Sequence, residues 1–142
     1  MCSSDLEADD EADVLLMVLG RDPRLRRIAL FDHVVNNADR KGGHLLPVGP
    51  ELVHGCDHGI CFAVEPKLRT VLWGWAGDPL PASLLADVEN LAQALRDGLD
   101  DVDRWLDEEE REALRDRCRD LLREQRFPLP SGHWPAIPWP VF

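Results

Sequence analysis

The stretch that decides the fold is Asn37–Gly59, which reads NADRKGGHLLPVGPELVHGCDHG. An aspartate lies in a glycine-containing loop at each end of it, Asp39 in the first loop and Asp57 in the second. Between them, residues 44–48 and 51–54 have the composition of two short strands joined by a Gly-Pro turn. The sequence therefore predicts a β-hairpin with one carboxylate in the loop on either side.

Helical patterns flank this hairpin. Asp22-Pro23 is a favourable helix start and leads into a buried helix predicted over 23–36. Its periodic positions are Leu25, Ile28, Ala29, Phe31, Asp32 and Val35. An apolar stripe predicts a further helix over 81–96, and acidic residues followed by basic ones predict another over 107–126. A short helix over 8–19, a third strand over 60–64, an undecided turn or loop over 66–75 and a helical turn over 100–106 complete the prediction.

Composition excludes several classes of function. The chain has 142 residues and a net charge of -11 at pH 7. So acidic a protein is not expected to bind nucleic acid in bulk or to adhere to an anionic membrane. No apolar run approaches the roughly 20 residues that a membrane-spanning helix needs, so no transmembrane segment is expected. Four cysteines without a signal peptide predict reduced thiols and a cytoplasmic location.

Three segments are expected along the chain. Residues 1–20 are expected to be a poorly ordered or artefactual lead-in, because the first six resemble a translated adapter sequence. Residues 21–127 form the folded body. Residues 128–142 are rich in Pro and Trp, and this tail is expected to dock on the body in an extended conformation.

The two aspartates suit phosphoryl transfer. Asp39, on a rigid loop, can accept the proton of a substrate hydroxyl and align it for attack. Arg40 can hold a neighbouring carboxylate or phosphate through its bidentate fork. Asp57 supplies a hard oxygen ligand for the divalent metal that developing phosphoryl charge requires.

The same motifs resemble those of phosphatidylinositol 3-/4-kinase-like proteins. The NADRKGGH sequence of residues 37–44 resembles their catalytic loop, and is nearest the type II phosphatidylinositol 4-kinase form. The CDHG sequence of residues 56–59 resembles the metal-binding Asp-x-Gly element that follows a short hairpin in that fold. Residues 31–77, with Trp-Gly-Trp near the end, also resemble a family of short bacterial proteins related to these kinases.

The resemblance implies an α+β fold equivalent to the C-terminal lobe of a kinase-like protein, mostly helical with a small antiparallel hairpin. It implies an ATP- and Mg²⁺-dependent phosphotransferase in which Asp39 is the base, Arg40 stands beside it and Asp57 binds the metal. Asn37 and Lys41 would then belong to the nucleotide site. The phosphate acceptor stays open between a protein hydroxyl, a lipid headgroup and a small molecule, although the acidic chain disfavours a lipid surface.

Two departures from the family pattern matter. His44 stands where the second metal ligand is usually Asn, and imidazole suits Mn²⁺ or Zn²⁺ better than Mg²⁺. The sequence also has no Gly-rich nucleotide loop and no strand with a phosphate-anchoring Lys, so the N-terminal lobe is expected to be absent and the chain alone to be inactive. A non-catalytic, pseudokinase-like binding or regulatory module is therefore the alternative function.

A small zinc-binding domain is a further alternative. Four metal-binding side chains lie close together in the sequence, namely His54, Cys56, His58 and Cys61. Their spacing differs from the paired Cys-x-x-Cys pattern of structural zinc sites, and buried thiols would explain the cysteines equally. His33 is expected to be a core or boundary residue, and Glu108–Glu110 a solvated first helical turn.

Overall fold

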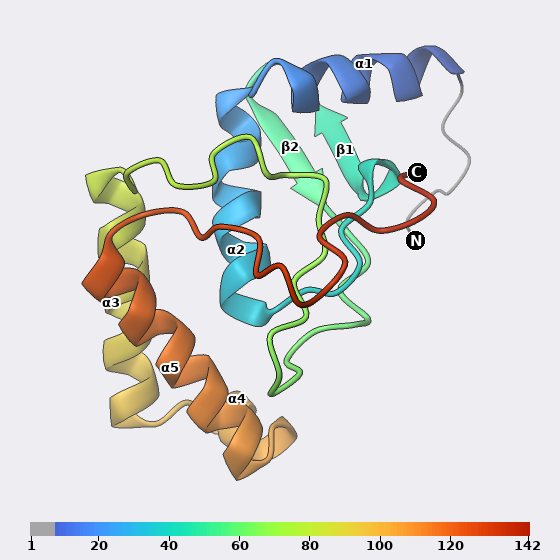
Figure 1. The fold of residues 1–142 in the computed structure, drawn as a ribbon. Coiled ribbons are helices and arrows are strands. Elements are labelled where there is room, and N and C mark those ends of the chain that lie inside the picture. Colours follow the sequence, from blue (N-terminus) through green and yellow to red (C-terminus); the bar gives the residue numbers. More distant parts are fainter. Residues whose placement is uncertain (1–7) are drawn as a thin grey trace.

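The computed structural model describes residues 8–142, in which a small two-stranded hairpin lies at one side of a set of helices (Figure 1). In chain order the elements are α1 (Ala8–Leu19), the 3₁₀ turn η1 (Pro23–Leu25), α2 (Arg26–Val35), the 3₁₀ turn η2 (Gly42–His44), β1 (Leu45–Val48), β2 (Leu52–Gly55), α3 (Ala82–Asp97), α4 (Asp100–Trp105) and α5 (Glu108–Glu124). The sheet within the described residues has two antiparallel strands. This mixed, mostly helical architecture is compatible with the predicted α+β class.

The hairpin forms where it was predicted, to within a residue. Strands β1 and β2 pair from Leu45 opposite Gly55 to Val48 opposite Leu52. The third strand predicted over 60–64 is wrong, because the backbone there bonds to other partners. The carbonyl of Ile60 accepts from the amide of Ala38, and the amide of Phe62 donates to the carbonyl of Val35, at 2.9 and 2.6 Å. The segment is thus hydrogen-bonded to the end of α2 and to the loop after it, and it does not pair with the hairpin.

Helix α2 begins and ends at residues suited to those positions. The carboxylate of Asp22 accepts from the amide of Arg24 at 3.0 Å, and Pro23 opens the first turn as 3₁₀ before α2 proper. The helix stops at Asn36, whose backbone is left-handed with φ of 56°. The predicted helix over 23–36 is therefore confirmed in outline, and the reversal at Asn36 sends the chain directly into the Asp39 loop.

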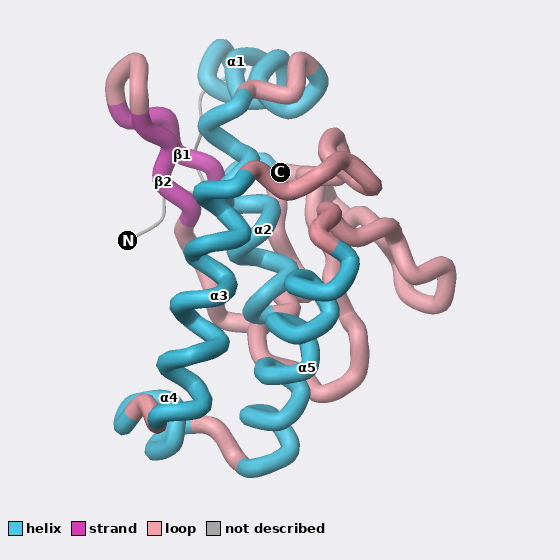
Figure 2. The backbone as a smooth tube through the Cα atoms, turned by 90° about the vertical axis from the view of Figure 1, so that its left-hand side faces the viewer, coloured by secondary structure: helices cyan, strands magenta, loops and turns pink. Residues whose placement is uncertain are grey.

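Helices α3 and α5 lie side by side and are joined at one end by α4 (Figure 2). Both present the apolar faces that the sequence predicted. The buried side chains are Leu84, Val88, Ala92 and Leu95 on α3, and Leu114, Cys118 and Leu121 on α5. Helix α5 starts in a reciprocal capping box between Asp107 and Glu110, each side chain accepting from the other's amide.

The C-terminal tail crosses the body without helix or strand, as predicted, and is held by backbone hydrogen bonds. The carbonyl of Ala136 accepts from the amide of Thr70 at 3.0 Å and from the indole Nε1 of Trp73 at 2.8 Å. The carbonyl of Val141 accepts from the amide of Gly42 at 2.7 Å. The end of the chain therefore rests on the loop that follows Asp39 (Figure 1).

The predicted lead-in, residues 1–20, lies partly outside the described residues, which start at residue 8. From there α1 runs to Leu19, and Val14 in its middle is only 1% exposed.

The expectation of reduced thiols is wrong at Cys56, which is disulfide-bonded, whereas Cys61 and Cys118 are free. In the part of the chain that the structure covers, no helix is long and apolar enough to cross a membrane. The cytoplasmic location stays a prediction.

Candidate catalytic site

A fully buried ion pair lies beneath the Asp39 loop. Arg40 donates from Nε and Nη2 to the two carboxylate oxygens of Asp32, both at 2.8 Å, and both side chains are 0% exposed. Its remaining nitrogen, Nη1, donates to the carbonyl oxygen of Cys56 at 2.8 Å. Burying two charges is costly unless their hydrogen bonds are satisfied, and here the fork of Arg40 is satisfied on both sides. The pair links the end of α2, the Asp39 loop and the chain after β2.

Close approach of the guanidinium depends on Gly55. A Cβ atom at that position would lie 3.3 Å from Nη1 of Arg40, which is tighter than most real contacts. The glycine at the end of β2 thus leaves room for the arginine that joins the two loops.

Asn37 holds the loop from inside. It is 0% exposed, its Nδ2 donates to Asp32 at 3.1 Å, and its Oδ1 accepts from the amide of Asp39 at 3.0 Å. This side-chain-to-backbone bond two residues on is the geometry of an Asx turn. The resemblance had implied a role in the nucleotide site, but the structure buries the Asn37 amide and uses it to set the conformation at Asp39.

The backbone on both sides of Asp39 is held by hydrogen bonds. The amide of the preceding Ala38 donates to Ile60, and that of the following Arg40 donates to Arg69 at 3.0 Å. The carbonyl of Arg40 in turn accepts from Val71 at 3.1 Å. The Asp39 side chain is half-buried, and its carboxylate has no hydrogen-bond donor among the described residues. Because its backbone is fixed and its oxygens are not already hydrogen-bonded, the Asp39 carboxylate can accept a proton from a substrate.

The two residues predicted to bind metal lie together. His44 Nε2 is 3.3 Å from Oδ2 of Asp57, and the Asp57 side chain is 55% exposed. His44 Nδ1 accepts from the amide of Lys41 at 3.3 Å, which leaves Nε2 as the ring nitrogen that faces the carboxylate. The amide of Cys56 also donates to the carbonyl of His44 at 3.0 Å, so both residues are fixed at the open end of the hairpin.

These two side chains suit a metal that is shared with a substrate. Among the described residues no group of three or more His, Cys, Asp or Glu is placed to hold an ion. Mg²⁺ is commonly bound through one or two carboxylates together with phosphate oxygens and water, and the exposed carboxylate of Asp57 fits that pattern. His44 would then act through its contact with the Asp57 carboxylate.

The zinc alternative fails on the same observation. Its four proposed ligands, named above, do not form a metal-binding group in the described part of the chain. Cys56 is moreover disulfide-bonded and offers no thiolate. Burial raises the pKa of the Cys61 thiol to about 11, so this cysteine remains protonated at neutral pH.

Asp32 is the residue of the site that sequence reasoning missed. It was counted only as a periodic position of α2. The available signal was an acidic residue on an otherwise buried helix face, because such a carboxylate needs a cationic partner. Arg40, eight positions later, is that partner.

Comparisons with known proteins add one relative. No family model matches the chain, and no solved structure matches it. The chain is similar to Protein Rv2133c of Mycobacterium tuberculosis (strain ATCC 25618 / H37Rv). The two are 47% identical over 135 residues, which cover 94% of this chain and 48% of that protein. The chain thus spans about half the length of the curated relative that it matches.

Proposed function

We propose that this chain is the part of an ATP- and Mg²⁺-dependent phosphotransferase that holds the catalytic carboxylates, with the fold of a phosphatidylinositol 3-/4-kinase-like C-terminal lobe. One observation carries the proposal. Arg40, directly after Asp39, donates to the carbonyl of Cys56, directly before Asp57, at 2.8 Å. Two loops 16 positions apart in sequence are therefore joined at the residues next to both aspartates.

Each residue then has a role that its surroundings support. Asp39 accepts the proton of the acceptor hydroxyl, because its carboxylate is partly exposed and is not engaged by described residues. Asp57 would hold the metal, and the contact from His44 would orient the Asp57 carboxylate. Lys41, half-buried in the same loop as Asp39, would supply a positive charge for the phosphates. Bound Mg²⁺ would neutralise charge on the nucleotide phosphates.

The acceptor is best sought among protein hydroxyls and small molecules. A net charge of -11 would repel an anionic lipid surface, so a lipid headgroup is the least favoured substrate class. The nucleotide-binding half is not evident in this sequence, and the relative extends well beyond the matched region. We therefore expect weak ATP binding and slow transfer by this chain alone.

A regulatory module that binds nucleotide without turnover is the second candidate. The contact between His44 and Asp57 favours it, because an imidazole at 3.3 Å occupies one of the carboxylate oxygens that a metal would use. In this case Asp39 would have no chemical role, whereas Asp57 would still matter for binding.

The deciding experiment compares Asp39→Asn and Asp57→Asn with the unaltered chain and with Asp87→Asn, an exposed carboxylate on α3. Binding of Mg²⁺·ATP is measured by calorimetry, and turnover by release of ADP. The phosphotransferase predicts slow turnover that falls by at least about 100-fold in both site variants and is unchanged in Asp87→Asn. The regulatory module predicts binding without turnover, lost in Asp57→Asn and kept in Asp39→Asn. Turnover that survives both substitutions would refute the phosphotransferase.

A further inference from the structure

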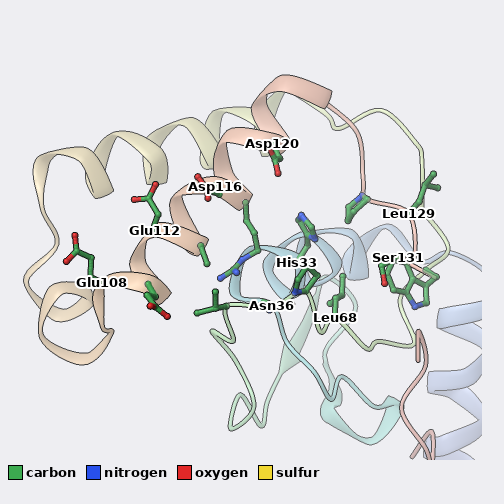
Figure 3. A pocket seen from close by; sticks show the side chains of 16 residues that line it. His33, Asn36, Leu68, Glu108, Glu112, Asp116, Asp120, Leu129 and Ser131 are labelled. Carbon is green, nitrogen blue, oxygen red and sulfur yellow. The ribbon is translucent and has the colours of Figure 1, made fainter. Parts of the chain in front are cut away.

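A hollow separate from the proposed catalytic residues is bounded by α2, α5, residues 64–68 and the start of the tail (Figure 3). Its volume is about 710 Å³, and none of Asp39, His44 and Asp57 lines it. Small-molecule sites in proteins are mostly apolar cavities of about 300 to 1,000 Å³ with a few well-placed polar groups. This cavity has the size of such a site, and its walls decide which ligand it suits.

One wall of the cavity is apolar. It is formed by Leu68, Trp73 and Leu129, and Figure 3 shows the two leucines on the side away from Glu108. The indole Nε1 of Trp73 already donates to the carbonyl of Ala136 at 2.8 Å, so the ring offers the cavity only apolar surface. Aromatic rings pack favourably on one another in stacked or edge-to-face arrangements. This wall therefore suits a flat aromatic group.

The carboxylates along α5 do not require a cationic ligand. Glu112, Asp116 and Asp120 each contact the arginine three positions further along the helix, at 3.4, 2.9 and 3.0 Å. Those arginines do not line the cavity. The helix thus satisfies its own charges at this wall and directs no paired arginine towards a ligand.

Two further polar side chains of the lining are committed to the protein backbone. Arg117 donates from Nε to the carbonyl of Val34 at 2.8 Å and from Nη1 to that of Ala63 at 3.3 Å. Asn36 uses both ends of its side-chain amide on backbone groups of residues 63–67. Arg117 is the basic residue of the lining, so an anionic ligand would find no uncommitted cation there.

His33 is an uncommitted polar group, and it lies between α5 and the apolar wall (Figure 3). It has no hydrogen-bond or ion-pair partner among residues 8–142. The polar atoms that are fully enclosed there without a partner are Nη2 of Arg117 and Nε1 of Trp134. The ring nitrogens of His33 are not among them, so they reach open space. A largely buried imidazole with accessible, unpaired nitrogens at a cavity is an unused recognition group.

The protonation state of His33 defines what it can recognise. Burial lowers the pKa of its imidazole to about 4, with nearby Arg117 adding to the effect and Asp120 opposing it. At neutral pH the ring is therefore uncharged, with one nitrogen that donates and one that accepts. A ligand hydroxyl, which also donates and accepts, matches it.

We propose that this cavity binds an uncharged, flat aromatic molecule that carries a hydroxyl group. The aromatic part packs on the wall of Leu68, Trp73 and Leu129, and the hydroxyl bonds to His33. A charged ligand is disfavoured in either sign, because the α5 carboxylates are already paired and no free cation lines the cavity. This inference does not depend on the proposed phosphotransfer.

The first test uses the complete 142-residue chain and N-phenylnaphthylamine, an uncharged dye whose fluorescence rises in apolar surroundings. Anilinonaphthalene sulfonate has the same rings and a negative charge. Fluorescence titration measures the dissociation constant of each dye. The uncharged dye is expected to bind saturably, and the sulfonate at least about tenfold more weakly, because its charge finds no partner.

Competition against the uncharged dye isolates the hydroxyl. We expect para-hydroxybiphenyl to bind at least about threefold more tightly than biphenyl, whereas apolar surface alone would favour biphenyl. His33→Phe keeps a ring and removes the hydrogen bond, so this preference should vanish while biphenyl keeps its affinity. His33→Gln still donates and accepts, and it should retain part of the preference.

Matched variants locate the bound dye. Ala113→Trp fills the cavity from α5 and is expected to weaken dye binding at least about tenfold, whereas Ala86→Trp on the exposed face of α3 leaves it unchanged. Leu129→Asp places a charge in the apolar wall and should also weaken binding. Leu19→Asp on α1 is its control, because the two leucines are 70% and 71% exposed.

Four results would overturn the proposal. The first is no binding of the uncharged dye, and the second is equal binding of the sulfonate. The third is a preference for para-hydroxybiphenyl that is absent from the unaltered chain or survives in His33→Phe. The fourth is self-association, seen by sedimentation and abolished by Ala113→Trp, which would identify a second copy of the chain as the occupant. Circular dichroism of each variant confirms that the fold is retained.

Discussion

Arg40 Nη1 donates to the carbonyl oxygen of Cys56 at 2.8 Å, while the rest of its fork holds the buried carboxylate of Asp32. One side chain thereby sets the spacing of two loops that each present an aspartate. The hairpin already brings His44 and Cys56 together at its open end, and Arg40 ties the Asp39 loop to the same point. This relationship makes the geometry of the site and the stability of the fold depend on the same residue.

Removing the guanidinium should therefore be costly. Arg40→Met leaves the Asp32 carboxylate buried without its cationic partner and with only the hydrogen bond from Asn37, so we expect the free energy of unfolding to fall by about 3 to 5 kcal/mol. Urea denaturation measures the change. The double variant Asp32→Leu with Arg40→Met should recover much of the loss, since neither charge then remains buried.

An exposed ion pair provides the control for this loss. Arg123 contacts Asp120 at 3.0 Å on the surface of α5, with 66% and 56% of the side chains exposed. Arg123→Met should cost less than about 1 kcal/mol. If Arg40→Met were no more destabilising than Arg123→Met, the buried pair would not have the structural role described above.

Docking of the tail on the loop that follows Asp39 predicts a specific steric effect. A Cβ at Gly42 would lie 2.7 Å from a ring carbon of Phe142, whereas a Cβ at Gly43 would have its nearest contact at 3.7 Å. Gly42→Ala should destabilise by about 1 to 2 kcal/mol because the ring must move, and Gly43→Ala by clearly less. Thermal unfolding compares the two variants.

A double-mutant cycle checks the cause. In the Gly42→Ala background, Phe142→Ala should cost less than it does in the unaltered chain, because the ring contact is already disturbed. Strict additivity of the two substitutions would show that Gly42 is sensitive for another reason.

If the proposed function holds, the 3.3 Å contact between His44 and Asp57 predicts how the metal preference can be changed. In His44→Asn the imidazole is replaced by a hard carbonyl oxygen, so the ratio of Mg²⁺- to Mn²⁺-supported turnover should rise by about tenfold. His54→Asn, an exposed position on β2, is the control and should leave the ratio unchanged. A ratio that His44→Asn does not alter would argue that His44 has no influence on the metal.

His33 predicts a pH dependence of stability. Its pKa is lowered to about 4 in the folded chain from 6.5, so folding favours the neutral ring. The associated stability is fully present above pH 6.5 and is lost as the pH falls from there to about 4. Over this window the unaltered chain should lose about 3 kcal/mol more than His33→Gln does, measured by urea denaturation at each pH.

The comparison with His33→Gln removes the contribution of other groups. Arg117 and Asp120 lie near this position in both proteins, so their own titration cancels in the difference. Parallel pH profiles for the two proteins would contradict a buried neutral histidine at this position.

Much of the local structure could be predicted from the sequence. The hairpin over β1 and β2, the apolar stripe of α3 and the capped start of α5 each follow from a pattern within a few neighbouring residues. The prediction of a third strand was wrong because a β-rich composition does not show which backbone groups a segment will bond to. The backbone of residues 60–64 bonds to the end of α2 and to the loop after it, and no third strand forms there.

The sequence by itself determined the order of the elements, the two loops with their aspartates and the acidic character of the surface. Only the tertiary structure decided that Asn37 turns inward, that Asp32 is the partner of Arg40 and that His44 meets Asp57. It also decided that α5 and α2 enclose a cavity around His33. The reason is physical. Periodicity records which face of an element is buried, whereas the pairing of polar groups depends on how separate elements pack, and a buried charge takes whichever partner that packing brings within reach.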